Sequence, residues 1–322
     1  MAKSIGATHA VPRKGIRLWS RRGVARSEAL WGWIWISPWV VGFLIFLVGP
    51  MIASFYFSLT DYDLISPPRF VGLENYITAL SGEDELFWPS LGRTMLFVAI
   101  TVPLGVAGSL GMALLLNQAF RGIALFRTIF YLPSLVPPVA AALIWAWMLQ
   151  PSFGIVNYFL QTIGLPGPPW MTSPQWALPS VIVVALWSSL GGARMLIFLA
   201  ALQDVPQELT EAAKIDGANA LQRFLNVTVP MISPVIFFNF VLGVIGSFSV
   251  FTVAYIATDG GPAYATWFYV LHLFHNAFSF LRMGYASALA WILFALLLAF
   301  TFTQFRLAKS WVHYGGETRA DA

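Results

Sequence analysis

Long stretches without a charged residue determine what this chain can fold into. Trp31–Thr60, Thr94–Phe120 and Thr128–Ala193 contain no Asp, Glu, Lys or Arg. A transmembrane helix needs about 20 predominantly apolar residues, so each stretch is long enough to cross a bilayer. Only 10% of the residues are charged, whereas soluble proteins carry roughly 25%. The sequence therefore predicts an all-α membrane protein.

Six membrane-spanning helices are predicted from these stretches. Thr128–Ala193 is too long for one crossing, and the Pro- and Gly-rich segment Pro151–Pro174 divides it. The first helix has its apolar centre at Ile34–Leu59, which is too long for the core of a cleaved signal peptide, so an uncleaved helix is expected. The other five helices are expected near residues 92–117, 124–149, 177–202, 230–257 and 284–306.

One further segment, Ala263–Phe280, is apolar and almost long enough to be a seventh span. It is interrupted by His272, His275 and Asn276. We expect an interfacial or partly re-entrant helix here. The two histidines have no neighbouring carboxylate in the sequence, so no metal site is expected.

Lys and Arg are distributed unevenly between the predicted loops. With six spans, the side that holds both termini carries 15 of the 18 Lys and Arg residues, and the other side carries Arg69, Arg93 and Arg282. Basic loops remain in the cytoplasm, so both termini are predicted to be cytoplasmic. The predicted organisation is a basic tail at 1–30, which would face membrane lipids, a six-helix transmembrane domain at 31–308 and a second cytoplasmic tail at 309–322.

The loop between the fourth and fifth predicted spans reads as two short helices joined by a turn. Asp204 is expected to cap the first helix, with Gln207 completing a capping box, and Gly217 is expected to form the turn. A second helix is expected near 220–227, with Leu221, Phe224 and Leu225 on its buried side. Pro230 is expected to open the fifth span.

This loop, residues 203–230, resembles the EAA signature of the membrane subunits of bacterial ATP-binding-cassette importers. The signature is Glu-Ala-Ala, three residues, Gly, nine residues and Ile-x-Leu-Pro. The matching residues are Glu211, Ala212, Ala213, Gly217 and Pro230, while Val227 and Val229 replace Ile and Leu. The resemblance implies that Glu211, Ala212, Ala213, Asp216 and Gly217 couple the chain to an ATPase.

Other segments resemble the carbohydrate-uptake branch of the same family. They are Ser37-Pro38, Gly49–Asp63, Phe70–Tyr76, Phe126–Val139 and Asp259–Pro262. The resemblance implies a permease subunit of a bacterial or archaeal cytoplasmic membrane. Its implied partners are a second homologous permease, two ATPase subunits and an external solute-binding protein. The implied cargo is a sugar or oligosaccharide.

Polar and aromatic residues in two spans are candidates for the substrate pathway. Asn239, Ser247, Phe248 and Phe251 combine hydrogen-bonding groups with rings that stack on sugars. Arg194 is expected well inside the fourth span, where a charge usually faces a cavity or a partner. Small polar residues also join membrane helices, and helical spacing prevents all of these residues from facing one cavity.

The chain itself is not expected to be an enzyme. It contains no Gly-Lys dipeptide and therefore no Walker sequence, so ATP and magnesium are expected on the partner ATPase and no cofactor on this chain. The basic residues follow membrane topology, so no nucleic-acid partner is expected. The alternatives are a permease for a glycerophosphate or polyol, an ion-coupled secondary transporter, and a membrane protein that transports nothing.

Overall fold

The computed structural model describes residues 21–313, with side chains from residue 27 onward, as two compact units that meet between Tyr56 and Phe57. The first unit is helical. It comprises α1 (Arg21–Phe43), a π-helical turn (Leu44–Val48) and most of α2 (Gly49–Ser58). Pro50 cannot donate a hydrogen bond to the preceding turn, and the π-helical turn ends two residues before it.

The helix of the first unit begins earlier than predicted. It starts at Arg21 and so includes the last ten residues of the predicted tail 1–30, and Ser37-Pro38 lies inside it. The apolar part, Ser27–Ser58, is long enough to cross a membrane. The rest of that tail, and residues 314–322 of the second tail, lie outside the described residues.

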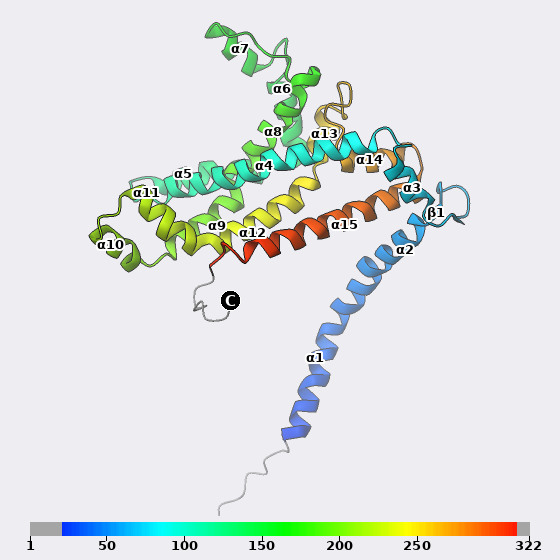
Figure 1. Cartoon of the computed structure of the whole chain (residues 1–322), viewed down its shortest axis with the longest axis horizontal. Coiled ribbons are helices and arrows are strands. Elements are labelled where there is room, and N and C mark those ends of the chain that lie inside the picture. The colour runs from blue at the N-terminus through cyan, green and yellow to red at the C-terminus, as the bar shows by residue number, and fades with distance from the viewer. Residues whose placement is uncertain (1–20, 314–322) are drawn as a thin grey trace, which may run out of the picture. The chain divides into compact units, whose positions relative to one another are not determined.

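Three long helices form the frame of the second unit and run alongside one another in Figure 1: α4 (Phe87–Leu116), α12 (Val229–Phe248) and α15 (Met283–Ala308). Together with α9 (Gly192–Gln203) they enclose the main apolar core. Phe198 and Phe248 are fully buried there. The apolar residues that make these helices fit a bilayer also fill the space between them.

Two of the predicted spans are bent. The first bent pair joins α5 (Ile123–Tyr131) and a short 3₁₀ turn (Leu132–Leu135) to α6 (Pro138–Met148) at 96°, and the second joins α8 (Pro174–Leu190) to α9 at 44°. The helices predicted near 124–149 and 177–202 are therefore each divided by a break. Pro137 and Pro138 account for the first break, because proline cannot continue the hydrogen-bond ladder.

The second break is explained by contact between the two bent pairs. A Cβ atom on Gly191 would collide with the backbone carbonyl of Phe130, and one on Gly192 would lie 2.7 Å from Ser134 Cβ. Only glycine fits this contact. Residues 21–313 thus contain four helices that are long and apolar enough to cross a membrane, or up to six if each bent pair is one span.

The fifth predicted span is part of a longer helical segment, Ala220–Ala257. It comprises α11 (Ala220–Arg223), a π-helical turn (Phe224–Thr228), α12 and α13 (Thr252–Ala257). Pro230 lies in the first turn of α12, as predicted for the start of the fifth span, and the π-helical turn before it joins α12 to α11. The wide turn accommodates a proline within a helix that continues.

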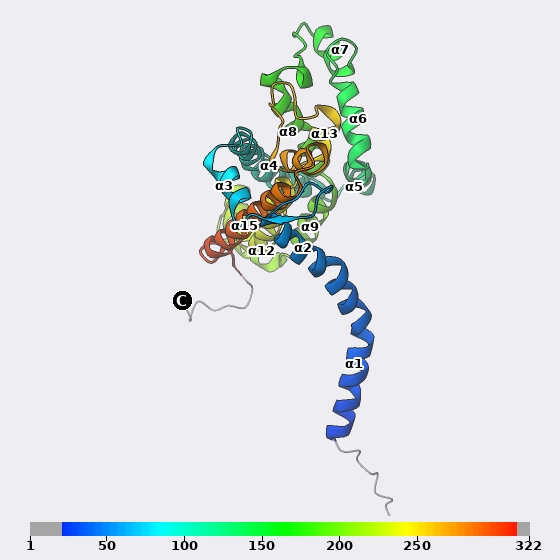
Figure 2. The same cartoon turned by 90° about the vertical axis from the view of Figure 1, so that its right-hand side faces the viewer.

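Short elements gather near the start of α15 in Figures 1 and 2. They are β1 (Thr60–Asp61), its antiparallel partner β2 (Arg69–Phe70), α3 (Glu74–Ser81), α14 (Tyr269–Phe274) and a π-helical turn (His275–Ser279). The helical part of Ala263–Phe280 is too short to cross a membrane, in agreement with its exclusion from the spans. Two further elements, α7 (Ile155–Thr162) and a 3₁₀ turn (Trp170–Thr172), lie between α6 and α8 in the chain.

Candidate functional site

The loop between α9 and α12 forms the helical hairpin that the sequence predicts. Its first helix is α10 (Gln207–Ile215), which is followed by Gly217 and α11. Gly217 has a φ of +83°, a left-handed conformation that glycine adopts at low cost. The backbone N–H of Ala218 donates to Ala213 O and closes the turn. Gly217 therefore sets the direction in which the second helix leaves the first.

The predicted cap of α10 is wrong. Asp204 ends α9, where its backbone N–H donates to Ala200 O, and α10 begins only after Pro206. Proline disfavours a helical conformation in the residue before it, so Val205 separates the two helices. A capping box forms instead at α11. Asn219 Oδ1 accepts from the backbone of Gln222, and the Gln222 side chain accepts from the backbone of Asn219.

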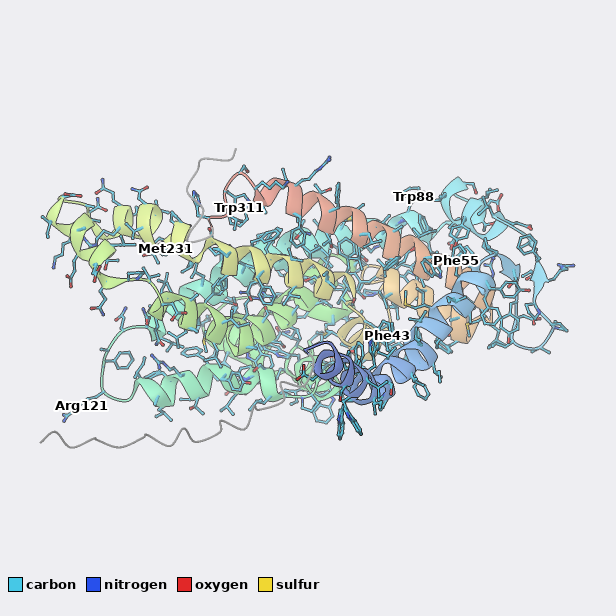
Figure 3. All side chains as sticks on the ribbon, turned by 90° about the horizontal axis from the view of Figure 1, so that it is seen from below. Phe43, Phe55, Trp88, Arg121, Met231 and Trp311 are labelled. Carbon is cyan, nitrogen blue, oxygen red and sulfur yellow. The ribbon has the colours of Figure 1, made fainter. Side chains whose placement is uncertain are left out.

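Four of the five predicted coupling residues lie on the exposed surface of this hairpin. Glu211, Ala212, Asp216 and Gly217 are exposed, and Ala213 is half-buried. They are open to a partner, but their role remains a prediction. Figure 3 shows Met231, near the start of α12, and Arg121 toward the end of the unit that carries the hairpin, with Trp88 at the opposite end.

Large apolar side chains are exposed beside them. Ile215, which no sequence pattern marks as a site residue, is 86% exposed. Leu221 and Leu225 are also exposed, so their prediction as buried residues is wrong for this chain, and Phe224 is half-buried. No described element covers this surface. A group of exposed apolar residues marks a site of contact with another protein or with the membrane.

Arg194 lies in the first turn of α9, and its guanidinium group occupies a space left by two glycines. A Cβ atom on Gly105 of α4 would lie 2.8 Å from Nη1, and one on Gly243 of α12 would lie 3.4 Å from Nη2. The Ser189 hydroxyl lies beside the same position on Gly105. The guanidinium thus lies between α4 and α12, and the side chain is partly exposed.

The four other residues predicted for the substrate pathway do not face one cavity, as their spacing indicates. Ser247 is half-buried and its hydroxyl lies 3.5 Å from Thr101 Oγ1, one turn of α12 beyond Gly243. Asn239 is 3% exposed, and its amide donates to Val235 O in the same helix. Phe248 is buried against Phe300 of α15.

Phe251 belongs to a separate aromatic cluster. Its ring stacks on Tyr255 at 5.1 Å and lies 5.0 Å from Phe274. Arg194 and Ser247 are thus the two candidates that the structure places near the same face of α12.

A buried polar network that the sequence analysis missed surrounds Asp84, in the loop before α4. Asp84 Oδ2 accepts hydrogen bonds from His272 Nε2 at 2.7 Å and from the Tyr285 hydroxyl at 2.6 Å. Trp267 Nε1 donates to His272 Nδ1 at 3.1 Å, so the proton of a neutral His272 is on Nε2 and points to Asp84. Asp84 is 188 residues from His272 in sequence, and no local pattern indicates the pair.

Burial opposes the ionisation of Asp84, but this effect is outweighed. The hydrogen bonds from His272, Tyr285 and the Leu86 backbone stabilise the carboxylate and hold the pKa of Asp84 well below its usual range. The network joins the loop before α4 to α14 and α15. Its observed role is structural.

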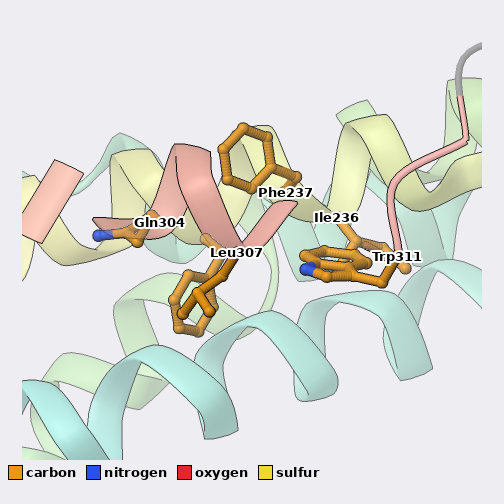
Figure 4. A pocket seen from close by; sticks show the side chains of 6 residues that line it. Ile236, Phe237, Gln304, Leu307 and Trp311 are labelled. Atoms are coloured by element: carbon orange, nitrogen blue, oxygen red, sulfur yellow. The ribbon is translucent and has the colours of Figure 1, made fainter. Parts of the chain in front are cut away.

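An apolar cavity of about 210 Å³ lies between the middle of α12 and the C-terminal end of α15. Its lining residues are Ile236, Phe237, Phe240, Gln304, Leu307 and Trp311. In Figure 4 the Gln304 side chain extends away from Trp311. The cavity contains none of the residues predicted for coupling or for substrate.

Residues 105–312 match the family described as "Binding-protein-dependent transport system inner membrane component". This match covers Arg194, the hairpin and α15. The chain belongs to this family. The protein is therefore a multi-pass membrane permease of a binding-protein-dependent transport system.

Relatives match this permease over nearly its whole length. It is 41% identical to a probable ABC transporter permease protein, YesP, of Bacillus subtilis, over 90% of this chain and 94% of the relative. It is 32% identical to the sulfoquinovosyl glycerol transport system permease protein SmoG of Agrobacterium fabrum, over 93% and 97%. It is 33% identical to the trehalose/maltose transport system permease protein MalF of Thermococcus litoralis, over 88% and 95%.

The fold of this permease is also known from a solved structure. The bacterial alginate ABC transporter in complex with alginate pentasaccharide-bound periplasmic protein contains a chain that matches with a TM-score of 0.78 and 24% identity. The match covers 91% of this permease and 98% of that chain. At this identity the likeness concerns the fold.

Proposed function

We propose that this permease translocates a sugar or oligosaccharide across the cytoplasmic membrane, using ATP hydrolysed by separate ATPase subunits. The observation that carries the proposal is the exposed hairpin with Glu211 and Gly217 at its surface, within a chain of this family. In the proposal, α10 docks on an ATPase, and closure of two ATPases around ATP moves the helices of the permease.

The surface of the hairpin suits such a partner. Glu211 offers a carboxylate, the small side chains of Ala212 and Ala213 allow close approach, and Ile215 adds apolar area. A second permease of the same family and an external solute-binding protein complete the proposed assembly. No cofactor is assigned to this chain, and ATP with magnesium is assigned to the ATPases.

The proposed orientation places the hairpin and both termini in the cytoplasm. Lys214 and Arg223 lie in the hairpin, and Arg121 in the connection between α4 and α5. Arg306 lies in the last turn of α15, and Lys309 directly follows that helix. Loops rich in Lys and Arg remain cytoplasmic.

The cargo class is supported by the names of relatives. Three of them are permeases for trehalose/maltose, sulfoquinovosyl glycerol and sn-glycerol-3-phosphate. A glycerophosphate or polyol is therefore the second candidate. An ion-coupled transporter has less support, because such proteins use intramembrane acidic residues and this chain has no Asp or Glu between Glu85 and Asp204.

The test is the substitution Glu211→Lys in the assembled importer, reconstituted with its binding protein in proteoliposomes. We expect ATP-driven uptake to fall at least tenfold while the chain remains inserted in the membrane. Glu208→Lys is the matched control, because it makes the same charge change on the same helix outside the signature. Normal uptake by E211K would refute the coupling role. Failure to recover an ATPase with the wild-type permease would refute the importer.

A further inference from the structure

The interior of this permease carries a permanent positive charge that nothing in the described chain neutralises. Arg194 forms no hydrogen bond or ion pair with any residue from 21 to 313, although it lies within the bent pair α8–α9. Arginine stays protonated in proteins, so it cannot lose the charge as a buried lysine can. A charge at membrane depth is costly unless it is paired or lies in an aqueous cavity.

The sequence offers Arg194 no acidic partner within the spans around it. No Asp or Glu occurs between Glu85 and Asp204, between Asp216 and Asp259, or between Asp259 and Glu317. These three intervals contain α4, α9, α12 and α15. The groups next to the guanidinium are neutral: the Ser189 hydroxyl, Val102 and the two glycines.

The guanidinium is nevertheless held in place. Gly105 and Gly243 leave room for its two Nη atoms on two different helices, and a side chain at Gly105 would displace it. The face of α9 next to it remains open in this chain, where Ala193 is exposed and Leu196 is 38% exposed. Arg194 thus combines a fixed position with access from one side.

We infer that Arg194 binds an anionic group of the transported saccharide, a carboxylate, sulfonate or phosphate, so that the substrate class is acidic. The inference rests on the proposed function. A guanidinium group forms paired hydrogen bonds with all three anions, because its planar fork matches their oxygen atoms. The anion would satisfy the free donors of Arg194 only while the substrate passes, and Ser247, on the adjacent face of α12, is placed to contact its hydroxyl groups.

The test measures charge preference in the assembled importer, with its ATPases and partner permease, in nanodiscs at fixed ionic strength. The probes are a uronate disaccharide, a 6-sulfonated hexose and a hexose 6-phosphate, each beside its uncharged counterpart. For the wild-type complex we expect at least one anionic probe to bind tenfold or more tightly than its counterpart. Arg194→Gln should remove the preference, while the affinity for the uncharged probe changes less than twofold.

Two further variants separate binding from folding. Arg306→Gln removes a cation that lies at the end of α15 over the Phe302 ring, and should keep the full preference. Gly105→Ala keeps the charge but displaces the guanidinium, and should reduce the preference severalfold even if R194Q fails to assemble.

Three outcomes would overturn the inference. The wild type could show no preference for any anionic probe, as expected if an acidic residue of the partner permease pairs with Arg194. R194Q could retain the preference, or it could weaken charged and uncharged probes equally. Each outcome leaves the importer itself standing if the complex still hydrolyses ATP in response to its binding protein.

Discussion

Asp84 Oδ2 lies 2.7 Å from His272 Nε2, and this contact joins the loop before α4 to the helix that precedes α15. The two side chains are almost fully enclosed: 13% of the Asp84 side chain and 4% of the His272 side chain are exposed. The Asp61–Arg69 pair near β1 and β2 is a contrasting case, because its side chains are 65% and 77% exposed. The N···O distances of the two pairs are similar, 2.7 Å and 2.9 Å, but their exposure to solvent differs.

Asp84→Asn should therefore destabilise the protein more than Asp61→Asn. Loss of a hydrogen bond to a buried charged group costs about 1.5–3 kcal/mol, whereas an exposed ion pair contributes about 0–1 kcal/mol. Thermal unfolding of both variants in the same detergent gives the comparison. Equal losses of stability would show that the enclosed network contributes no more than the surface pair.

Lowering the pH should remove the stabilisation that the Asp84 carboxylate gives to the folded protein. Its pKa is lowered in the folded protein, so the stabilisation is complete above the carboxyl pKa of the unfolded chain, about 3.9, and declines as the pH falls below it. The difference in melting temperature between wild type and D84N should be largest near neutral pH. It should shrink between about pH 4 and pH 3, and a difference that stays constant over this range would contradict the assignment.

Gly217→Ala should impair coupling without preventing insertion. A non-glycine residue in the left-handed conformation costs about 1–2 kcal/mol, so the turn after α10 would shift or loosen. We expect lower uptake per ATP hydrolysed, measured as both rates in the same proteoliposomes. Gly111→Ala is a suitable control, because a Cβ atom there meets nothing within 4 Å.

Gly108→Val should disturb the packing of α4 against α8. A Cβ atom on Gly108 would collide with the Leu190 side chain, and overfilling a packed interface costs about 1–3 kcal/mol. The melting temperature of G108V should therefore fall, while that of Gly111→Val should remain near wild type. Equal melting temperatures would mean that Gly108 does not serve packing against α8.

The sequence predicts the long helices well because the charge-free stretches set their length. The last span was expected near 284–306 and is observed as Met283–Ala308. The breaks in the bent pairs were not predicted, because prolines also occur inside continuous membrane helices. Nothing local indicates that Gly191 rests on the Phe130 carbonyl.

In the candidate site too, features that depend on neighbouring residues in sequence were predicted, and features that depend on distant segments were not. The hairpin is local, so the turn at Gly217 follows from residues close together in sequence. The position of Arg194 between Gly105 and Gly243, and the pairing of Asp84 with His272, depend on contacts between distant segments. The misplaced cap at Asp204 has a local cause: Pro206 keeps Val205 out of the helix, so α10 begins at Gln207, two residues later than a cap at Asp204 requires.

A single helix, α9, connects the break at Gly191 to the start of α10. Helix α9 has 12 residues, about 18 Å at 1.5 Å per residue, with Arg194 in its first turn and Asp204 at its end. In the proposed mechanism, a displacement of the hairpin would tilt α9 about the contact between Gly191 and Phe130, three residues from Arg194, and so change the direction of the Arg194 side chain. We expect force applied in the cytoplasm to reorient the cation within the membrane, so that the step that consumes ATP is also the step that releases the anion.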